Sequence, residues 1–273
     1  MYKLERVQFD KISGETKRYL LGVYTICDWE AEAAKKITKI KPIINLSSTK
    51  ECYYEVTKIV QVAEKQPRGE FEFKTYLEKC VQYGRENKIP ILLDESLDFI
   101  TAKLDEIKPH RVLEIGTAIG FSAINFSKYL DEAGRIDTIE IESLRVEQAL
   151  ENIKMVGVED KIRVMEGDAL DILPYLNEKY DVIFIDASKG KYNEFFEHAL
   201  RLIKVGGWII ADNVLYKGMV MSDYNKHKQR TAVRNLREYI KEVTENPMFE
   251  TEILEVGDGL AISKKKWWMH NCA

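Results

Sequence analysis

The second half of the chain alternates short apolar runs with segments whose apolar residues recur at helical spacing. The clearest run is YDVIFI at 180–185, which stops at a carboxylate, Asp186. Near-continuous apolar strands alternating with helices predict βαβ units, and hence a mostly parallel sheet covered by helices on both faces. The expected strands are 112–115, 136–141, 162–165, 180–185 and 208–211; the expected helices are 121–130, 143–156 and 193–203, and Gly206–Gly207 should turn the chain into the last strand.

The pattern near the end of the chain predicts one more helix and two more strands. The helix covers 230–244, and the strands cover 249–255 and 259–263 around a glycine-containing turn. Two strands joined by so short a turn form an antiparallel hairpin, which we expect to close one edge of the sheet. The expected fold class is therefore α/β and Rossmann-like, with an antiparallel C-terminal hairpin.

Residues 1–68 show a different pattern. Segments 18–26 and 42–46 are β-like, whereas 29–40 and 49–65 have helical spacing. The joint is expected near Pro67-Arg68-Gly69. We therefore expect a small N-terminal α/β extension over 1–68 and a main domain over 69–273.

Composition narrows the class of protein. Lys and Arg number 41 against 45 Asp and Glu, so no overall positive charge favours a nucleic-acid partner. The four cysteines lack CxxC and Cys/His spacing, which argues against a zinc site and fits a reducing cytoplasm. The first residues do not resemble a signal peptide, and no run reaches the ~18 apolar residues of a membrane span. We expect a cytoplasmic protein without a membrane partner.

A glycine-rich turn follows the first expected strand of the main domain. It reads EIGTAIG and contains Glu114, Gly116, Thr117 and Gly120. Its glycines let the backbone approach a ligand, and the helix that follows directs N–H groups toward it. A dinucleotide fold would have GxGxxG, but Ala118 occupies the position of the second glycine. This argues against a nicotinamide-dependent oxidoreductase.

Acidic residues stand at three successive strand ends. Glu114 is placed to face a cationic ligand group, and Glu140 stands where a ribose-binding carboxylate belongs. The third strand ends in Asp168-Ala169, a neighbour for an adenine ring. Because ligands bind at the carboxyl ends of parallel strands, the three together predict a nucleoside-type cofactor, although a single strand–glycine–helix turn is equally compatible with packing alone.

The next two strand ends carry a second polar set. Asp186 and Lys189 follow the fourth strand, and Asp212-Asn213 follow the fifth. Their oxygen donors suit Mg²⁺, Mn²⁺ or Ca²⁺ rather than zinc. A bound ion would lower the pKa of a substrate hydroxyl, and Lys189 is the candidate base. Taken singly, Asp186 is as compatible with a helix cap, and Asp212-Asn213 with a turn.

These motifs together resemble the cation-dependent O-methyltransferases, which include the catechol and caffeoyl-CoA enzymes and their bacterial relatives. The resemblance covers about 70–263, in the expected order and spacing. It has no counterpart for residues 1–68 or for the tail 264–273. The motifs that carry it are RENKIPIL (85–92), LEIGTAIGFSA (113–123), the strand end at Glu140, GDAL (167–170), FIDASKGKY (184–192), GGWIIADNVLYKG (206–218) and VGDGLAIS (256–263).

The resemblance implies a seven-stranded class I methyltransferase sheet, S-adenosylmethionine (SAM) as cofactor and a homodimer. It makes Lys189 and Asp186 the catalytic residues, and it places a divalent cation, Mg²⁺ first, on Asp186, Asp212 and Asn213. The implied SAM residues are Glu114, Gly116, Thr117, Gly120, Ser122, Glu140, Asp168, Ala169 and Asp186.

The substrate is open at this stage. The leading hypothesis is a small aromatic molecule with adjacent hydroxyls. The alternative is a hydroxylated uridine of tRNA, since basic residues gather after the second polar set and could meet phosphates; a solvated helix face explains them as well. A non-catalytic SAM-binding protein is a further alternative. The basic residues are Lys217, Lys226, His227, Lys228, Arg230, Arg234 and Arg237.

Overall fold

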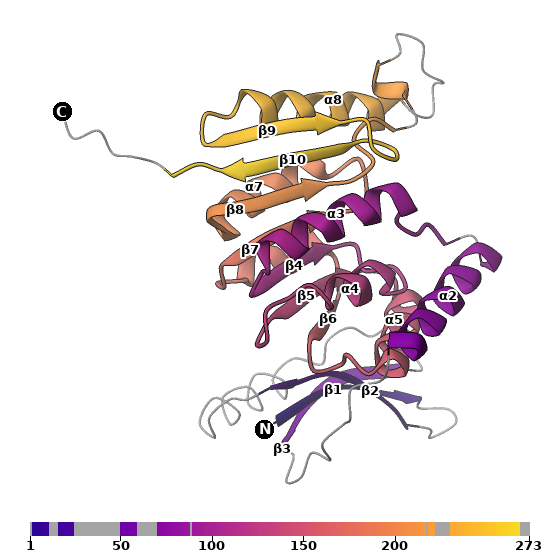
Figure 1. Ribbon diagram of the computed structural model, residues 1–273. Coiled ribbons are helices and arrows are strands. Elements are labelled where there is room, and N and C mark those ends of the chain that lie inside the picture. The colour runs from indigo at the N-terminus through magenta and orange to yellow at the C-terminus, as the bar shows by residue number, and fades with distance from the viewer. Residues whose placement is uncertain are drawn as a thin grey trace.

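The computed structural model describes residues 2–10, 16–24, 50–58, 70–87, 89–216, 218–221 and 230–267. Its main body is a seven-stranded sheet in the order β6-β5-β4-β7-β8-β10-β9 (Figure 1). The five strands from β6 to β8 are parallel, and β10 runs antiparallel between β8 and β9. The strands are β4 (Arg111–Ile115), β5 (Arg135–Glu140), β6 (Ile162–Glu166), β7 (Tyr180–Ile185), β8 (Ile203–Ala211), β9 (Phe249–Leu254) and β10 (Leu260–Lys265).

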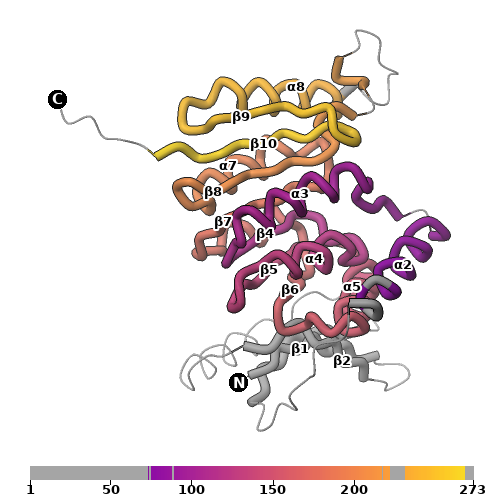
Figure 2. The backbone as a smooth tube through the Cα atoms, viewed as in Figure 1, coloured from indigo at the N-terminus to yellow at the C-terminus, as the bar shows by residue number. Residues whose placement is uncertain are grey.

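Helices cover both faces of this sheet, and the sheet separates the core into two apolar clusters. The first face carries α2 (Glu70–Glu86), α3 (Asp94–Ile107), α4 (Phe121–Phe126) and α5 (Ser143–Val156). The second carries α6 (Ala169–Ile172), α7 (Tyr192–Leu202) and α8 (Arg230–Glu245), with the short 3-10 helices η1 (Leu173–Tyr175) and η2 (Met219–Met221). Figure 2 traces the chain between the β6 and β9 edges of the sheet. No helix among the described residues is long and apolar enough to cross a membrane.

The expected elements of the main domain are confirmed, with two differences. The helix expected over 121–130 ends at Phe126, where Asn125 and Ser127 donate side-chain hydrogen bonds to backbone carbonyls of their own turn. The turn expected at Gly206–Gly207 lies inside β8, which already begins at Ile203. There the register with β7 shifts, so the glycines form an irregularity within the strand rather than a separate turn.

The extension contains a separate antiparallel sheet in the order β2-β1-β3, with β2 beside β6 and α5. Its strands are β1 (Tyr2–Asp10), β2 (Thr16–Tyr24) and β3 (Lys50–Lys58). The helix expected over 49–65 is wrong at 50–58, because these residues pair with β1 as a strand. The expected elements 29–40 and 42–46 lie outside the described residues, and a domain division at 68/69 remains a prediction.

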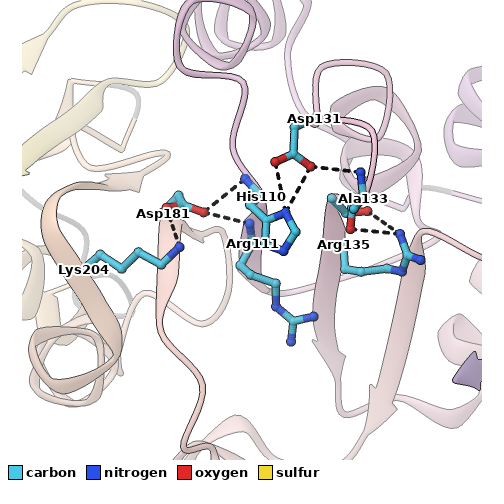
Figure 3. A network of polar contacts seen from close by, with 8 residues as sticks. His110, Arg111, Asp131, Ala133, Arg135, Asp181 and Lys204 are labelled. Atoms are coloured by element: carbon cyan, nitrogen blue, oxygen red, sulfur yellow. Dashed lines mark hydrogen bonds and ion pairs between the residues drawn. The ribbon is translucent and has the colours of Figure 1, made fainter. Parts of the chain in front are cut away.

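Polar contacts fasten the amino ends of the parallel strands. Asp181 accepts hydrogen bonds from the backbone N–H groups of His110 and Arg111 and forms an ion pair with Lys204 (Figure 3). The side chain of His110 contacts Asp131. These contacts lie at the amino ends of the strands, opposite the carboxyl ends. That arrangement leaves the carboxyl ends open for a ligand.

Candidate active site

A cavity of about 870 Å³ opens at the carboxyl ends of the parallel strands. Residues that directly follow β4, β5, β6, β7 and β8 all contribute to its wall. The structure thus brings ten of the twelve sequence-predicted site residues to one cavity: Gly116, Thr117, Ser122, Glu140, Asp168, Ala169, Asp186, Lys189, Asp212 and Asn213. The two others, Glu114 and Gly120, are buried and do not line the cavity.

The turn after β4 requires glycine at its first position. Gly116 has φ +107°, and a Cβ built on it would lie 2.0 Å from the backbone oxygen of Asp186. The backbone N–H groups of Gly116 and Thr117 both donate to the carbonyl of Ile139 at the end of β5. The turn is therefore pressed between β5 and β7, and its exposed side forms part of the cavity wall.

Glu140 is held at the end of β5 by backbone groups. Its Oε2 accepts from the N–H of Ala118 at 2.8 Å, and its Oε1 accepts from Ile141 and Glu142 at 3.0 and 2.9 Å. The residue is 5 % exposed and lines the cavity. A carboxylate fixed in this way is prepared to accept hydrogen bonds from a ligand without further ordering.

Asp168 and Ala169 continue the wall at the start of α6. Asp168 Oδ1 accepts from the N–H of Leu170 at 2.9 Å, so this aspartate is the N-cap of the helix as well as a cavity residue. Ala169 is buried and lines the cavity. The capping and ligand-binding interpretations of such an aspartate are therefore compatible.

Glu114 lies behind the cavity wall and is fully buried. Its carboxylate accepts hydrogen bonds from the hydroxyls of Ser122 and Thr138. Thr138 also contacts the hydroxyl of Thr117 at 2.6 Å, so Glu114 is linked to two cavity residues through hydroxyl groups. Burial raises the pKa of Glu114 to about 7, although the two hydroxyl hydrogen bonds oppose the shift.

This burial makes a prediction about stability. The pKa of Glu114 in the folded protein exceeds its ordinary value of 4.5. The protonated carboxyl group therefore contributes fully to the free energy of unfolding below pH 4.5, and this contribution is lost as pH rises through about 7. The loss is on the order of 3 kcal/mol. The difference in free energy of unfolding between Glu114→Gln and the unsubstituted protein should therefore shift in favour of the variant as pH rises from 5 to 8. Urea unfolding without cofactor measures this difference. Glu151→Gln, on the exposed face of α5, should show no such gain; a gain of equal size there would contradict the assignment.

The second polar set converges at the ends of β7 and β8. Asn213 Nδ2 lies 3.2 Å from Asp186 Oδ1 and 2.9 Å from Asp212 Oδ2. Burial raises the pKa of Asp186, against the opposing effects of Lys189 and of the Asn213 hydrogen bond. Burial, and then the charge of Asp186, raises the pKa of Asp212 to about 7. Two carboxylates held together in this way would be stabilised by a positive charge between them.

The donor chemistry of this set fits a hard divalent cation. Among the described residues no three His, Cys, Asp or Glu side chains converge, so the set is two carboxylates and one amide. The oxygen and nitrogen of an amide exchange places by a half-turn of the side chain, and such a turn presents Asn213 Oδ1 to the position between the carboxylates. Three oxygen donors with room for water or substrate are a ligand set that Mg²⁺ accepts.

Backbone strain is concentrated around the cavity. Four non-glycine residues in the described part of the chain have positive φ, and three of them line the cavity: Ala118 (+46°), Asn213 (+62°) and Tyr216 (+48°). Such conformations persist only where the surrounding structure enforces them, and they gather at functional sites. Lys189 lies in the same wall, with its ammonium group 5.3 Å from the centre of the Tyr216 ring.

Several residues that line the cavity were not among the sequence-predicted site residues. Segment 90–93, which leads into α3, and Asp258 in the β9–β10 turn both contribute to it, as do Ile141, Glu142 and Arg145. Pro90–Leu92 and Asp258 lie in motifs that the sequence analysis quoted, but those motifs assigned them no role in the site. Of the basic residues after the second set, Arg234 lies near Glu238, and Arg237 donates to the carbonyl of Val220. Lys217, Lys226, His227 and Lys228 lie outside the described residues.

The fold and the strand-end cavity together define a class I methyltransferase architecture. Residues 71–266 match a family model described as O-methyltransferase. A catechol O-methyltransferase of Niastella koreensis is 35 % identical over 161 residues, which cover 56 % of this chain and 72 % of that protein. The tapetum-specific methyltransferase 1 of Arabidopsis thaliana is 32 % identical over 206 residues, covering 73 % and 88 %.

Solved structures agree with the sequence matches. The O-methyltransferase TomG of Streptomyces achromogenes, determined in complex with SAM, superposes with a TM-score of 0.63. It is 26 % identical and covers 76 % of this chain and 93 % of that one. The chain belongs to the O-methyltransferase family and is a SAM-dependent O-methyltransferase. This family membership sets aside the oxidoreductase hypothesis.

Proposed function

We propose that the enzyme methylates one hydroxyl of a small aromatic molecule that carries two adjacent hydroxyls, with the help of a divalent cation. In this proposal Asp186, Asp212 and Asn213 hold the cation, and Mg²⁺ is the first choice. The observation that carries it is the convergence of these three side chains beside Lys189 in one cavity. The similarity to a catechol O-methyltransferase supports the choice of substrate class.

The residues of the cavity divide into two groups. The first group lies at or after the carboxyl ends of β4, β5 and β6, and we assign it to the cofactor, with Glu114 behind it. It comprises the glycine turn, Ser122, Glu140 and Asp168-Ala169. The acceptor would bind on the side of β7 and β8. A cation held there by Asp186, Asp212 and Asn213 would supply a positive charge that lowers the pKa of a substrate hydroxyl.

The reaction requires a proton acceptor. The acceptor oxygen forms a bond to the methyl carbon while the bond from that carbon to sulfur breaks, and the hydroxyl proton must leave. Of the basic residues that line the cavity, Lys189 is the one whose charge acts on both Asp186 and Asp212. We assign the proton to its Nζ atom. The Tyr216 ring restricts where the ammonium group can lie.

Removal of this amine should slow the chemical step. Lys189→Met is expected to lower kcat about 100-fold, the scale of a lost general base. Lys189→Arg should fail to restore the rate, because a guanidinium group keeps its proton. Single-turnover rates with saturating SAM measure the effect, and Lys154→Met, exposed on α5, is the matched control. A Lys189→Arg enzyme with the original rate would exclude Lys189 as the base.

The function itself is tested by transfer of labelled methyl from SAM to a panel of catechols, with Mg²⁺ and with EDTA. Label in a catechol that disappears with EDTA is the expected result. Transfer that resists EDTA would contradict the metal requirement. Label in tRNA alone, in a parallel reaction, would contradict the small-molecule substrate. A homodimer and a cytoplasmic location remain predictions.

A further inference from the structure

Helix α3 places one buried hydroxyl against the proposed cation site. Ser96, in the first turn of the helix, is fully buried. Its Oγ donates to Asp212 Oδ1 at 3.3 Å, across 116 residues of sequence. The other carboxylate oxygen, Oδ2, faces Asn213 at 2.9 Å. The two oxygens of Asp212 therefore have different partners.

A second buried hydroxyl on α3, that of Thr101, makes the hydrogen bond that is usual for a helical serine or threonine. Thr101 is also buried on the helix, and its Oγ1 donates to the carbonyl of Leu97 at 2.8 Å within its own helix. Helical serines and threonines commonly make such bonds to the preceding turn. Ser96 makes its described hydrogen bond to a carboxylate of another element instead.

The β9–β10 turn is shaped around the same hydroxyl. Gly257 has φ +56°, and a Cβ built on it would lie 2.4 Å from Ser96 Oγ. Its backbone N–H lies 3.3 Å from Glu95 Oε2, so the turn contacts the first turn of α3 at two points. Ser96 is thus enclosed by the turn on one side and by Asp212 on the other.

We propose that Ser96 is a positioning residue that fixes Oδ1 of Asp212 and so keeps Oδ2 directed toward Asn213 and Asp186, where the cation would bind. An aspartate carboxyl group rotates easily about its last bond, and a partner on one oxygen restricts that rotation. Groups that orient a metal ligand typically change metal affinity by about 10–100-fold. The inference rests on the metal site of the proposed function.

The test is a direct measurement of metal binding. Mn²⁺ binding to the full chain, saturated with S-adenosylhomocysteine, is measured by calorimetry for the unsubstituted protein, Ser96→Ala and Thr101→Val. Both substitutions remove one buried hydroxyl from the same helix, and only the first removes a contact to Asp212. We expect Ser96→Ala to raise the Kd for Mn²⁺ about 10-fold, with kcat restored at saturating metal, and Thr101→Val to leave the Kd unchanged.

The other outcomes overturn the inference in distinguishable ways. Equal Mn²⁺ affinity of Ser96→Ala and the unsubstituted protein shows that Ser96 does not position Asp212. Equal weakening by both substitutions assigns the effect to general loosening of α3. An unsubstituted protein that binds no Mn²⁺ removes the metal site of the proposed function together with this inference. Unfolding midpoints in urea show whether each variant is folded.

Discussion

Asp212→Ala is expected to lower turnover on the order of 1,000-fold while leaving SAM binding nearly intact. The loss follows because Asp212 is one of the two carboxylates proposed to hold the cation, and removal of one strong electrostatic contact to reacting atoms has effects of this size. Asp212 lies on the side of β7 and β8, away from the residues assigned to the cofactor. Calorimetry with SAM and initial rates with Mg²⁺ separate the two effects.

The stability of this variant provides a second readout. Asp212 is 2 % exposed and close to Asp186, and burial with this neighbour raises its pKa. Removal of one of two buried like charges should leave the free energy of unfolding unchanged or increase it. Asp160→Ala, at an exposed position, is the control for loss of a carboxylate. Full activity of Asp212→Ala would exclude the metal mechanism.

Gly116→Ala is expected to have the largest effect on folding. The added Cβ would lie 2.0 Å from the backbone oxygen of Asp186, in a backbone conformation with φ +107°. Because the obstacle is backbone at the end of β7, the turn and the strand must separate. We expect the free energy of unfolding to fall by about 4 kcal/mol, among the largest effects of single substitutions, as measured by urea denaturation.

Gly218→Ala separates backbone strain from the clash. Gly218 also has positive φ, +73°, but a Cβ there would meet nothing within 4 Å. Its cost should be limited to the left-handed conformation, about 1 kcal/mol. Similar losses in the two variants would show that the close approach of Gly116 to Asp186 does not determine stability.

The main domain could be predicted well because its signals are local. Strand β7 is an uninterrupted apolar run, and α5 has regular helical spacing, so both coincide with the structure at every residue. Because ligands bind at the carboxyl ends of parallel strands, the polar residues there were expected to share one cavity. This expectation did not distinguish Glu114, which is buried behind the cavity wall, from Glu140, which lines it. The sequence predicts at which end of a strand a residue lies. It does not predict whether that residue lines the cavity or is buried behind it, because this depends on packing between elements.

The errors have equally physical causes. Segment 50–58 contains tyrosines and valine that satisfy helical and strand spacing alike, and its pairing with β1 decided between them. Helix α3 was not predicted, since its buried face includes Ser96 and Thr101 beside only two apolar residues, Ile100 and Leu104. The contact of Ser96 with Asp212 could not be predicted, because it joins distant parts of the sequence.

The order of the strands has a consequence for how such enzymes diversify. The residues assigned to the cofactor end or follow β4, β5 and β6, whereas the side proposed for the acceptor is lined by residues after β7 and β8, by the β9–β10 turn and by the segment before α3. A new acceptor preference can therefore arise from changes on one flank of the sheet, without retuning the nucleoside flank. A mutagenesis library aimed at new substrates would be confined to the cavity residues 90–93, Tyr216 and Asp258, and would leave Asn213 and Ser96 unchanged.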